Sequence, residues 1–261
     1  MRGPFKVIVG LSLGLSAVAC NFALGSDSAG EKGVVRFEYQ SNQCAFGCAL
    51  DRPALEGSAV TVSASGGAVD KHLHFVFEPG DVAAIKDQTE SCSCESSDGK
   101  TSTTGGTELA CKAGEKKSCS RQVTLETKTS GDGKLSVRED SGAIVDQIDL
   151  KVRAAGRVDV EVRAGQQPQK IGPDATGTYV VKRGDKVEIK STVFDASGKE
   201  VVFTYHGVGH EYSDKTVLAP DEKVILGASD VEYVTTGRAG DATVRVTARG
   251  AEAKAAFRVV P

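Results

Sequence analysis

From residue 33 onward, apolar and polar side chains alternate with a period of two, and no stretch keeps the 3.6-residue period of an amphipathic helix. The clearest case lies near the C-terminus, where Val244, Val246 and Ala248 alternate with threonine and arginine. After a turn at Gly250, the alternation resumes over residues 251–260. Successive side chains of a strand point to opposite faces, so this pattern predicts antiparallel strands with one buried face and one solvated face. We therefore expect an all-β chain with almost no helix.

Turns rich in glycine, aspartate and serine separate these short strands at the spacing of a β-sandwich. In one example, residues 195–199 turn the chain out of an alternating strand and into a second strand with Val201, Phe203 and Tyr205. Such a pair predicts a β-hairpin.

The length of 261 residues accommodates two domains of ordinary size. Residues 57–62 and 184–189 have the same character, since each is a glycine turn that enters an alternating strand. We therefore predict two tandem sandwiches, residues 34–155 and residues 156–261, with a boundary near Ala155 and Gly156.

Residues 234–248 resemble the closing signature of bacterial Ig-like domains, in which a strand, a Gly-x-Ala-Gly turn and an alternating Thr/Val strand follow one another. The strand over residues 184–194 fits the same family. In the first domain, residues 79–85 resemble the mid-domain strand of the family, and a long insertion, residues 86–120, follows them. The resemblance implies two Ig-like β-sandwiches and a cell-surface location, and it implies no chemistry.

Residues 1–19 have the form of an export signal. Arg2 and Lys6 precede an apolar stretch that is too short to remain in a bilayer as a spanning helix. Its last residues, Ala17 to Ala19, fit the cleavage site of an ordinary secretory signal. Because Cys20 follows them, they also resemble the lipobox of bacterial lipoproteins.

The lipoprotein resemblance implies that Cys20 is the mature N-terminus and carries a diacylglycerol together with an N-acyl chain such as palmitate. It also gives a use to the odd cysteine among seven. Asn21 after the lipidated residue implies an outer-membrane location. Residues 20–33 are polar and glycine-containing, which is typical of a flexible tether.

Six further cysteines form an even set that an oxidising compartment can close into three disulfides. They are Cys44, Cys48, Cys92, Cys94, Cys111 and Cys119. The insertion has little apolar surface, so we expect it to be held by these bridges. Cys92 and Cys94 are close enough that different partners are expected, and a bridge from Cys44 or Cys48 to the insertion would tie it to the start of the domain. A zinc site is the alternative, which the absence of C-x2-C spacing and the export signal disfavour.

The four histidines form two pairs. His72 and His74 lie on one face of a predicted strand, whereas His206, His210 and Glu211 surround a glycine-rich loop. Either pair could bind Zn²⁺ or Cu²⁺, and Glu211 would be a third ligand for the second pair. Its order is not the H-E-x-x-H of zinc peptidases, and a solvated strand face and loop are the simpler interpretation. An envelope metal-binding protein that uses His206, His210 and Glu211 is therefore our alternative function.

Catalytic signatures are absent from the sequence. It contains no G-x-S-x-G elbow and no nucleotide-binding loop. Paired carboxylates could cleave a glycosidic bond or bind Ca²⁺, but we interpret both acidic clusters as solvated surface. One cluster is Glu139, Asp140, Asp146 and Asp149, and the other is Asp221 and Glu222. No Trp and only five Tyr disfavour sugar binding by stacking. We therefore expect no enzyme and no cofactor.

The charges nearly cancel, with 32 Lys and Arg against 35 Asp and Glu, so a nucleic-acid partner is excluded. The sequence favours a lipid-anchored envelope protein that acts as a non-catalytic, adhesion-like interaction module. Its expected partners are the membrane, through the anchor, and another envelope or surface protein or a polysaccharide. Contacts are expected in residues 86–120 and in the loop over residues 206–213.

Overall fold

The computed structural model describes residues 29–41, 43, 48, 50–66, 73–96, 101–106, 108–204, 207–221 and 230–261. All regular secondary structure in this part of the chain is β-strand, as the alternation predicted. The predicted signal peptide and Cys20 lie outside the described residues.

Among the described residues, no helix has the length and the apolar character needed to cross a membrane.

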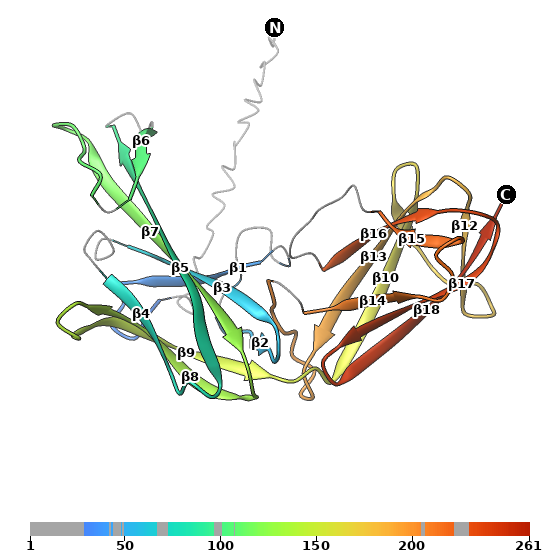
Figure 1. Ribbon diagram of the computed structural model, residues 1–261, viewed down its shortest axis with the longest axis horizontal. Helices are drawn as coiled ribbons and strands as arrows, with labels where there is room; N and C mark the ends of the chain where they lie inside the picture. Colours follow the sequence, from blue (N-terminus) through green and yellow to red (C-terminus); the bar gives the residue numbers. More distant parts are fainter. Residues whose placement is uncertain are drawn as a thin grey trace, which may run out of the picture.

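The first sandwich packs two sheets against each other, with strand orders β1-β3-β7-β5-β6 and β2-β9-β8-β4 (Figure 1). Its strands are β1 (Arg36–Gln40), β2 (Ala54–Leu55), β3 (Ala59–Ser65), β4 (Leu73–Glu78), β5 (Ala83–Glu95), β6 (Thr101–Gly105), β7 (Lys116–Thr127), β8 (Gly131–Glu139) and β9 (Ile144–Arg153). All neighbours are antiparallel except β2 and β9, which are parallel.

The second sandwich has sheets of order β11-β10-β13-β16-β15 and β12-β18-β17-β14. Its strands are β10 (Arg157–Gly165), β11 (Gln169–Ile171), β12 (Thr178–Lys182), β13 (Lys186–Phe194), β14 (Gly209–Tyr212), β15 (Leu218–Pro220), β16 (Val231–Thr236), β17 (Gly240–Ala248) and β18 (Ala251–Val260). Here β12 and β18 are the parallel pair.

Both sandwiches have immunoglobulin topology. Without the additional strands β2, β6, β11 and β12, each domain has seven strands, which can be lettered A to G in chain order. In both domains, strands A, B, E and D form one sheet in that order, and strands C, F and G form the other. This is the ABED and CFG arrangement of the immunoglobulin fold. The short β2 and β12 each run parallel to the last strand of their domain. The predicted fold class is confirmed.

The C-terminal hairpin follows the predicted register. Ala248 faces Ala251 across a two-residue turn in which Gly250 has φ +93, a backbone conformation that favours glycine. Val244, Val246 and Phe257 lie in the buried core of the second sandwich. The alternation therefore correctly predicted which face of this hairpin is buried.

The chain after β13 forms only the start of the predicted hairpin. Its pairing with β13 is limited to a bridge between Phe194 and Glu200, and Val202 then forms a parallel bridge with Ala54 of β2. The Val202 N–H donates to the Pro53 carbonyl, and the Val202 carbonyl accepts from the Leu55 N–H, both at 2.8 Å. The predicted second strand therefore pairs with β13 only at its start, where the Val201 N–H donates to the Val193 carbonyl at 3.0 Å, and Tyr205 lies outside the described residues.

The two sandwiches exchange core side chains at this crossing. Val202 belongs to the second domain by sequence and is 0% exposed in the core of the first. Leu55 belongs to the first domain and is 1% exposed in the core of the second. Thr204 adds three hydrogen bonds to the first domain, with Ala59, Thr61 and Gln40. Shared main-chain hydrogen bonds and shared cores join the domains into one body.

Asp146 holds the start of the described chain against the first sandwich. It lies on the inward face of β9 and is 0% exposed. Its carboxylate accepts hydrogen bonds from the main-chain N–H groups of Lys32, Val34, Val35 and Gln147, at 2.8–2.9 Å. The interpretation of this residue as solvated surface is wrong. Residues 29–33, predicted as part of a flexible tether, fold back through a bridge between Ala29 and Arg36.

Asp146→Ala should lower the free energy of unfolding by about 3 kcal/mol, because it removes four charge-assisted hydrogen bonds and leaves their donors unpaired. Asp149→Ala, on the exposed face of the same strand, is the matched control and should change stability by less than about 0.5 kcal/mol. Urea denaturation measures both values. Equal effects of the two substitutions would contradict the assigned role of Asp146.

The Asp146 contribution should also depend on pH. Burial opposes ionisation, but the main-chain donors outweigh it and hold the pKa of this carboxyl below its ordinary value. Its stabilising effect should be fully present above the unfolded pKa of about 3.9 and be lost as the pH falls through the lower native pKa. The difference in free energy of unfolding between wild type and Asp146→Ala should therefore be the same at neutral pH and at about pH 5. It should become smaller at about pH 3. A difference that stays constant across this range would contradict the assignment.

Candidate functional site

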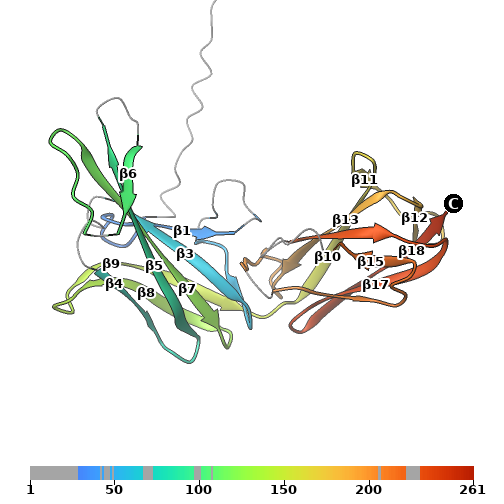
Figure 2. The ribbon, with the colours of Figure 1, turned by 45° about the horizontal axis from the view of Figure 1, so that its top comes forward.

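The two longest strands extend past the end of the first sandwich. β5 and β7 pair from Ala83 and Thr127 to Glu95 and Lys116, whereas β3 pairs with β7 only as far as Ser120. β6 joins the far edge of β5. We call the described part of residues 92–119, which includes β6, the ribbon. Figures 1 and 2 show it standing clear of both sandwiches.

The segment predicted as an insertion, residues 86–120, contains parts of β5 and β7 and all of β6. Residues 79–82 form a turn and not the predicted mid-domain strand, and β5 begins at Ala83. Much of the segment over residues 86–120 extends two strands of the sandwich, β5 and β7. The short strand β6 lies between them in the sequence. Main-chain pairing with β7, together with the cysteines, therefore orders this segment.

An ion pair between the buried Arg121 and the half-buried Glu90 lies where the ribbon leaves the core. The inward face of β7 changes from Leu125 and Val123, both 0% exposed, to Arg121. One Arg121 guanidinium nitrogen lies 2.6 Å from a Glu90 carboxylate oxygen, and the other donates to the Leu73 carbonyl at 2.6 Å. Loss of Glu90 would leave a buried charge, which is strongly destabilising. The pair therefore closes the end of the apolar core.

Two disulfides lie directly beyond this ion pair. Cys92 and Cys119 face each other in register on β5 and β7 with 4.0 Å between their Cα atoms, and Cys94 pairs with Cys111 at 5.4 Å. The expectation that Cys92 and Cys94 have different partners is confirmed. Because all four cysteines of the insertion pair with one another, the predicted bridge from Cys44 or Cys48 to the insertion is wrong.

Cys48 is also disulfide-bonded, and its partner lies outside the described residues, as does Cys44.

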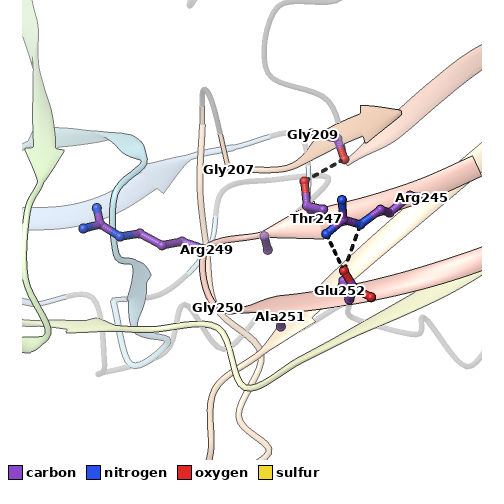
Figure 3. Close-up of a pocket in the computed structure, with 9 residues that line it drawn as sticks. Gly207, Gly209, Arg245, Thr247, Arg249, Gly250, Ala251 and Glu252 are labelled. Atoms are coloured by element: carbon purple, nitrogen blue, oxygen red, sulfur yellow. Dashed lines mark hydrogen bonds and ion pairs between the residues drawn. The ribbon is translucent and has the colours of Figure 1, made fainter. Parts of the chain in front are cut away.

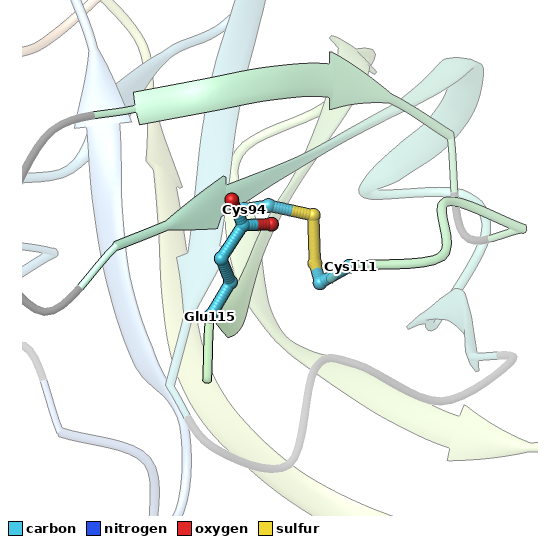
Figure 4. Close-up of side chains that lie close together, drawn as sticks. All are labelled: Cys94, Cys111 and Glu115. Carbon is cyan, nitrogen blue, oxygen red and sulfur yellow. A yellow bond between two sulfur atoms is a disulfide. The ribbon is translucent and has the colours of Figure 1, made fainter. Parts of the chain in front are cut away.

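Glu115 lies beside the Cys94–Cys111 bridge, and the three side chains together have the spacing of a metal site (Figure 4). Both sulfur atoms are bonded to each other, so neither is the thiolate that a soft metal requires. One carboxylate remains as a metal ligand, which is too few for a structural zinc site. The disulfide interpretation of this pair is therefore preferred to the zinc alternative.

Short hydroxyl side chains cover the outward face at the base of the ribbon. Ser65, Ser120 and Ser91 lie in register across β3, β7 and β5, and Ser118 faces Ser93 in the next row. They line a groove of about 630 Å³, whose full lining is Ser65, Gly66, Ser91, Ser93, Lys116, Lys117, Ser118, Cys119 and Ser120. This surface suits polar, hydrated contacts.

The predicted metal set is not brought together in the described part of the chain. Residues 209–212 form the edge strand β14, not a loop, and His206 lies outside the described residues. His210 and Glu211 are neighbours on this strand, so their side chains point to opposite faces. Glu211 points outward and pairs with Arg245 at 3.2 Å. In the other predicted pair, His74 lies on β4 and His72 is outside the described residues.

His210 points into the opening between the two sheets of the second sandwich. Its Nε2 is 3.5 Å from the Ser191 hydroxyl, and its Nδ1 is 3.8 Å from a Glu232 carboxylate oxygen. The Tyr212 hydroxyl donates to Glu232 at 3.0 Å. Burial lowers the pKa of the His210 imidazole, and Glu232 opposes this shift. The imidazole is therefore held largely neutral at pH 7.

These contacts follow the order of a serine–histidine–acid triad. Ser191, however, is 1% exposed, so a substrate cannot reach its hydroxyl in this conformation. The cluster instead connects strands of both sheets through β13, β14 and β16. We assign it a structural role.

A second groove, of about 510 Å³, lies at the end of the β17–β18 hairpin that faces the first domain (Figure 3). Arg245 donates to Glu252 at 2.8 Å across this hairpin. Arg249 extends toward the first domain and lies 3.3 Å from Glu56. Each arginine has an acidic partner here, so the groove presents no excess of one charge.

Sequence reasoning missed Asp146 and the crossing at Val202, although both left a signal. Asp146 lies two and four residues before Ile148 and Leu150, so its side chain points to the same, buried face of β9. Val201, Val202 and Phe203 form a continuous apolar run, which is typical of a segment buried on both faces.

No protein-family profile matches this chain, and no curated protein matches it. Solved structures do. The Yersinia pseudotuberculosis adhesin InvE matches at 12% identity over 91% of this chain and 62% of that chain, with a TM-score of 0.31. The Escherichia coli adhesin FdeC matches at 15% identity over 87% and 64%, with a TM-score of 0.28. Domains 4 and 5 of the S-layer protein SbsC match at 14% identity over 72% and 77%, with a TM-score of 0.27.

The chain spans less than two thirds of both adhesin structures. TM-scores of this size establish neither the fold nor the function of this chain, and the immunoglobulin assignment rests on strand order.

Proposed function

We propose that this chain is an exported lipoprotein whose two Ig-like domains serve as a non-catalytic interaction module at the bacterial cell envelope. The export signal and Cys20 support the anchor, and the Asn21 that follows supports an outer-membrane location. Disulfides of the kind found between Cys92 and Cys119 persist in oxidising compartments, which supports export.

The ribbon is the observation that carries the interaction role. Ordering an exposed segment costs conformational entropy, and the ribbon recovers little of this cost by burying apolar surface. Two disulfides and the Arg121–Glu90 ion pair hold it nonetheless. A projecting, polar and preorganised element of this kind is suited to contact with a partner, because little further ordering is needed on binding. The partner class that its surface fits is another envelope or surface protein, or a polysaccharide.

The test removes the ribbon without disturbing the sandwich. Ser91 and Ser120 face each other in register, so an Asn-Gly turn in place of residues 92–119 closes an ordinary hairpin at the end of the sandwich. The trimmed protein and the wild-type protein are each used as bait for chemical cross-linking in isolated cell envelopes. We expect the wild-type adducts to disappear from the trimmed protein.

The matched control shortens a different exposed turn, residues 140–143, which connects β8 and β9. This variant should keep the wild-type adducts. Circular dichroism and melting should show that both variants remain folded. Adducts that survive ribbon removal would overturn the contact role of the ribbon.

Cys20→Ala should move the protein from the membrane fraction to the soluble fraction. A diacylglycerol and an N-acyl chain together anchor stably, and the variant cannot carry the diacylglycerol. Fractionation of washed membranes, with immunodetection of the second domain, measures the shift. Retention of the unlipidated variant in washed membranes would contradict the anchor.

A further inference from the structure

A groove of about 500 Å³ crosses the outer face of the second sandwich, away from the ribbon and from the junction between the domains. It lies over the ends of β13 and β16 that pair with each other. Its lining is Pro168, Gly184, Asp185, Lys186, Val187, Glu188, Asp221, Tyr233, Val234, Thr235 and Thr236.

Tyr233 and Glu188 both line this groove. They face each other in register on β16 and β13, and both are partly exposed. Within the described part of the chain, neither side chain has a hydrogen bond or an ion pair. The groove therefore contains an aromatic ring, a phenol hydroxyl and a carboxylate that the fold itself does not use.

The other described tyrosines have structural contacts. Tyr39 is buried in the core of the first domain. The Tyr179 ring packs on Phe257 with 5.5 Å between centroids, and the Tyr212 hydroxyl donates to Glu232. Tyr233 is thus the one tyrosine among the described residues whose ring faces a groove without such a contact. The groove also has Lys186 on its rim, so it offers a cationic donor beside its carboxylates.

We propose that this groove binds one or two sugar units of a polysaccharide. A pyranose ring has an apolar C–H face that suits stacking on Tyr233, and a rim of hydroxyls that suits donation to Glu188 and acceptance from Lys186. The carboxylates of Asp185, Glu188 and Asp221 outnumber Lys186, which disfavours a phosphorylated or nucleotide ligand. β13 has a neighbour on each side in its sheet, so a peptide cannot add there as a strand.

This inference goes beyond the proposed contact through the ribbon. The expectation that sugar stacking is disfavoured rested on the low aromatic content of the whole chain, whereas this proposal rests on one tyrosine in one groove.

The test is a titration followed by amide NMR on the mature chain with Cys20→Ala. The probes are chitotriose, maltotriose and laminaritriose. At least one should cause saturable shifts confined to residues 184–188 and 233–236, with a Kd on the order of 1 mM for a groove that holds one or two sugar units. Tyr233→Phe should retain binding within about threefold, whereas Tyr233→Ala should weaken it by at least about tenfold.

Glu188→Gln should also weaken binding by about tenfold, because it removes a charged acceptor. Lys254→Ala, on the other sheet, should have no effect. The ribbon-trimmed protein should bind the sugar as well as the wild type, which separates this proposal from the proposed function. The proposal is overturned if no probe shifts these amides at about 10 mM, or if binding is unchanged in Tyr233→Ala.

Discussion

Replacing Val202 with aspartate is expected to lower the free energy of unfolding by about 4 kcal/mol. The Val202 side chain is 0% exposed in the core of the first sandwich, so the variant places an unpaired carboxylate among apolar groups. Because the residue belongs to the second domain by sequence, the damage should appear in the coupling of the domains. Wild type should melt in one transition, and the variant should melt in two, with the first domain unfolding earlier.

The matched control is Val180→Asp in the same domain. Val180 is 46% exposed, so this substitution should change stability by less than about 0.5 kcal/mol and preserve one transition. Differential scanning calorimetry and urea denaturation measure both variants. A Val202→Asp protein that melts in a single transition at the wild-type temperature would show that the domains do not share a core.

Replacing the four cysteines of the ribbon with serine is expected to unfold the ribbon while leaving both sandwiches intact. The bridges close segments with sequence separations of 27 and 17. Chain entropy alone gives about 3 kcal/mol of stabilisation for each bridge. Once the bridges are removed, little apolar packing beyond Arg121 is left to hold the ribbon. Hydrogen exchange should become fast in residues 92–119 and remain slow in β17 and β18.

A Cys94→Ser/Cys111→Ser variant separates the two bridges. The Cys92–Cys119 bridge joins residues that already pair in register, so it should protect the base of the ribbon while the part beyond it exchanges quickly. If amides of residues 92–119 keep wild-type protection in the variant with four serines, strand pairing alone holds the ribbon and the bridges are dispensable.

The alternation of side chains predicted the buried face of most strands, because a half-buried antiparallel sheet imposes a period of two. It worked best for the hairpin of β17 and β18, where Gly250 also fixed the turn. It failed at Val202 because long-range pairing overrides a local hairpin preference, and local sequence does not specify the partner. The apolar run around Val202 showed that both faces are buried, without showing in which core.

The candidate sites were less predictable. The even number of cysteines after Cys20 predicted disulfides. Which cysteines pair depends on the register between β5 and β7, and the spacing of cysteines in the sequence does not reveal that register. The metal hypothesis for His210 and Glu211 assumed that both residues lie in a loop. They lie instead next to each other on the strand β14, so their side chains point to opposite faces. Tyr233 had no distinguishing signal in the sequence, since its value as a platform comes from the cross-strand position of Glu188.

The most direct test of the interaction role is photo-cross-linking in living cells that carry the anchored, full-length protein. A photoreactive amino acid is placed at Thr104 on β6 or, as a control, at the exposed Lys254 on β18. We expect discrete adducts from position 104 and none from position 254. Adducts of equal yield at both positions, or none at position 104, would contradict the proposal that the ribbon is the contact surface.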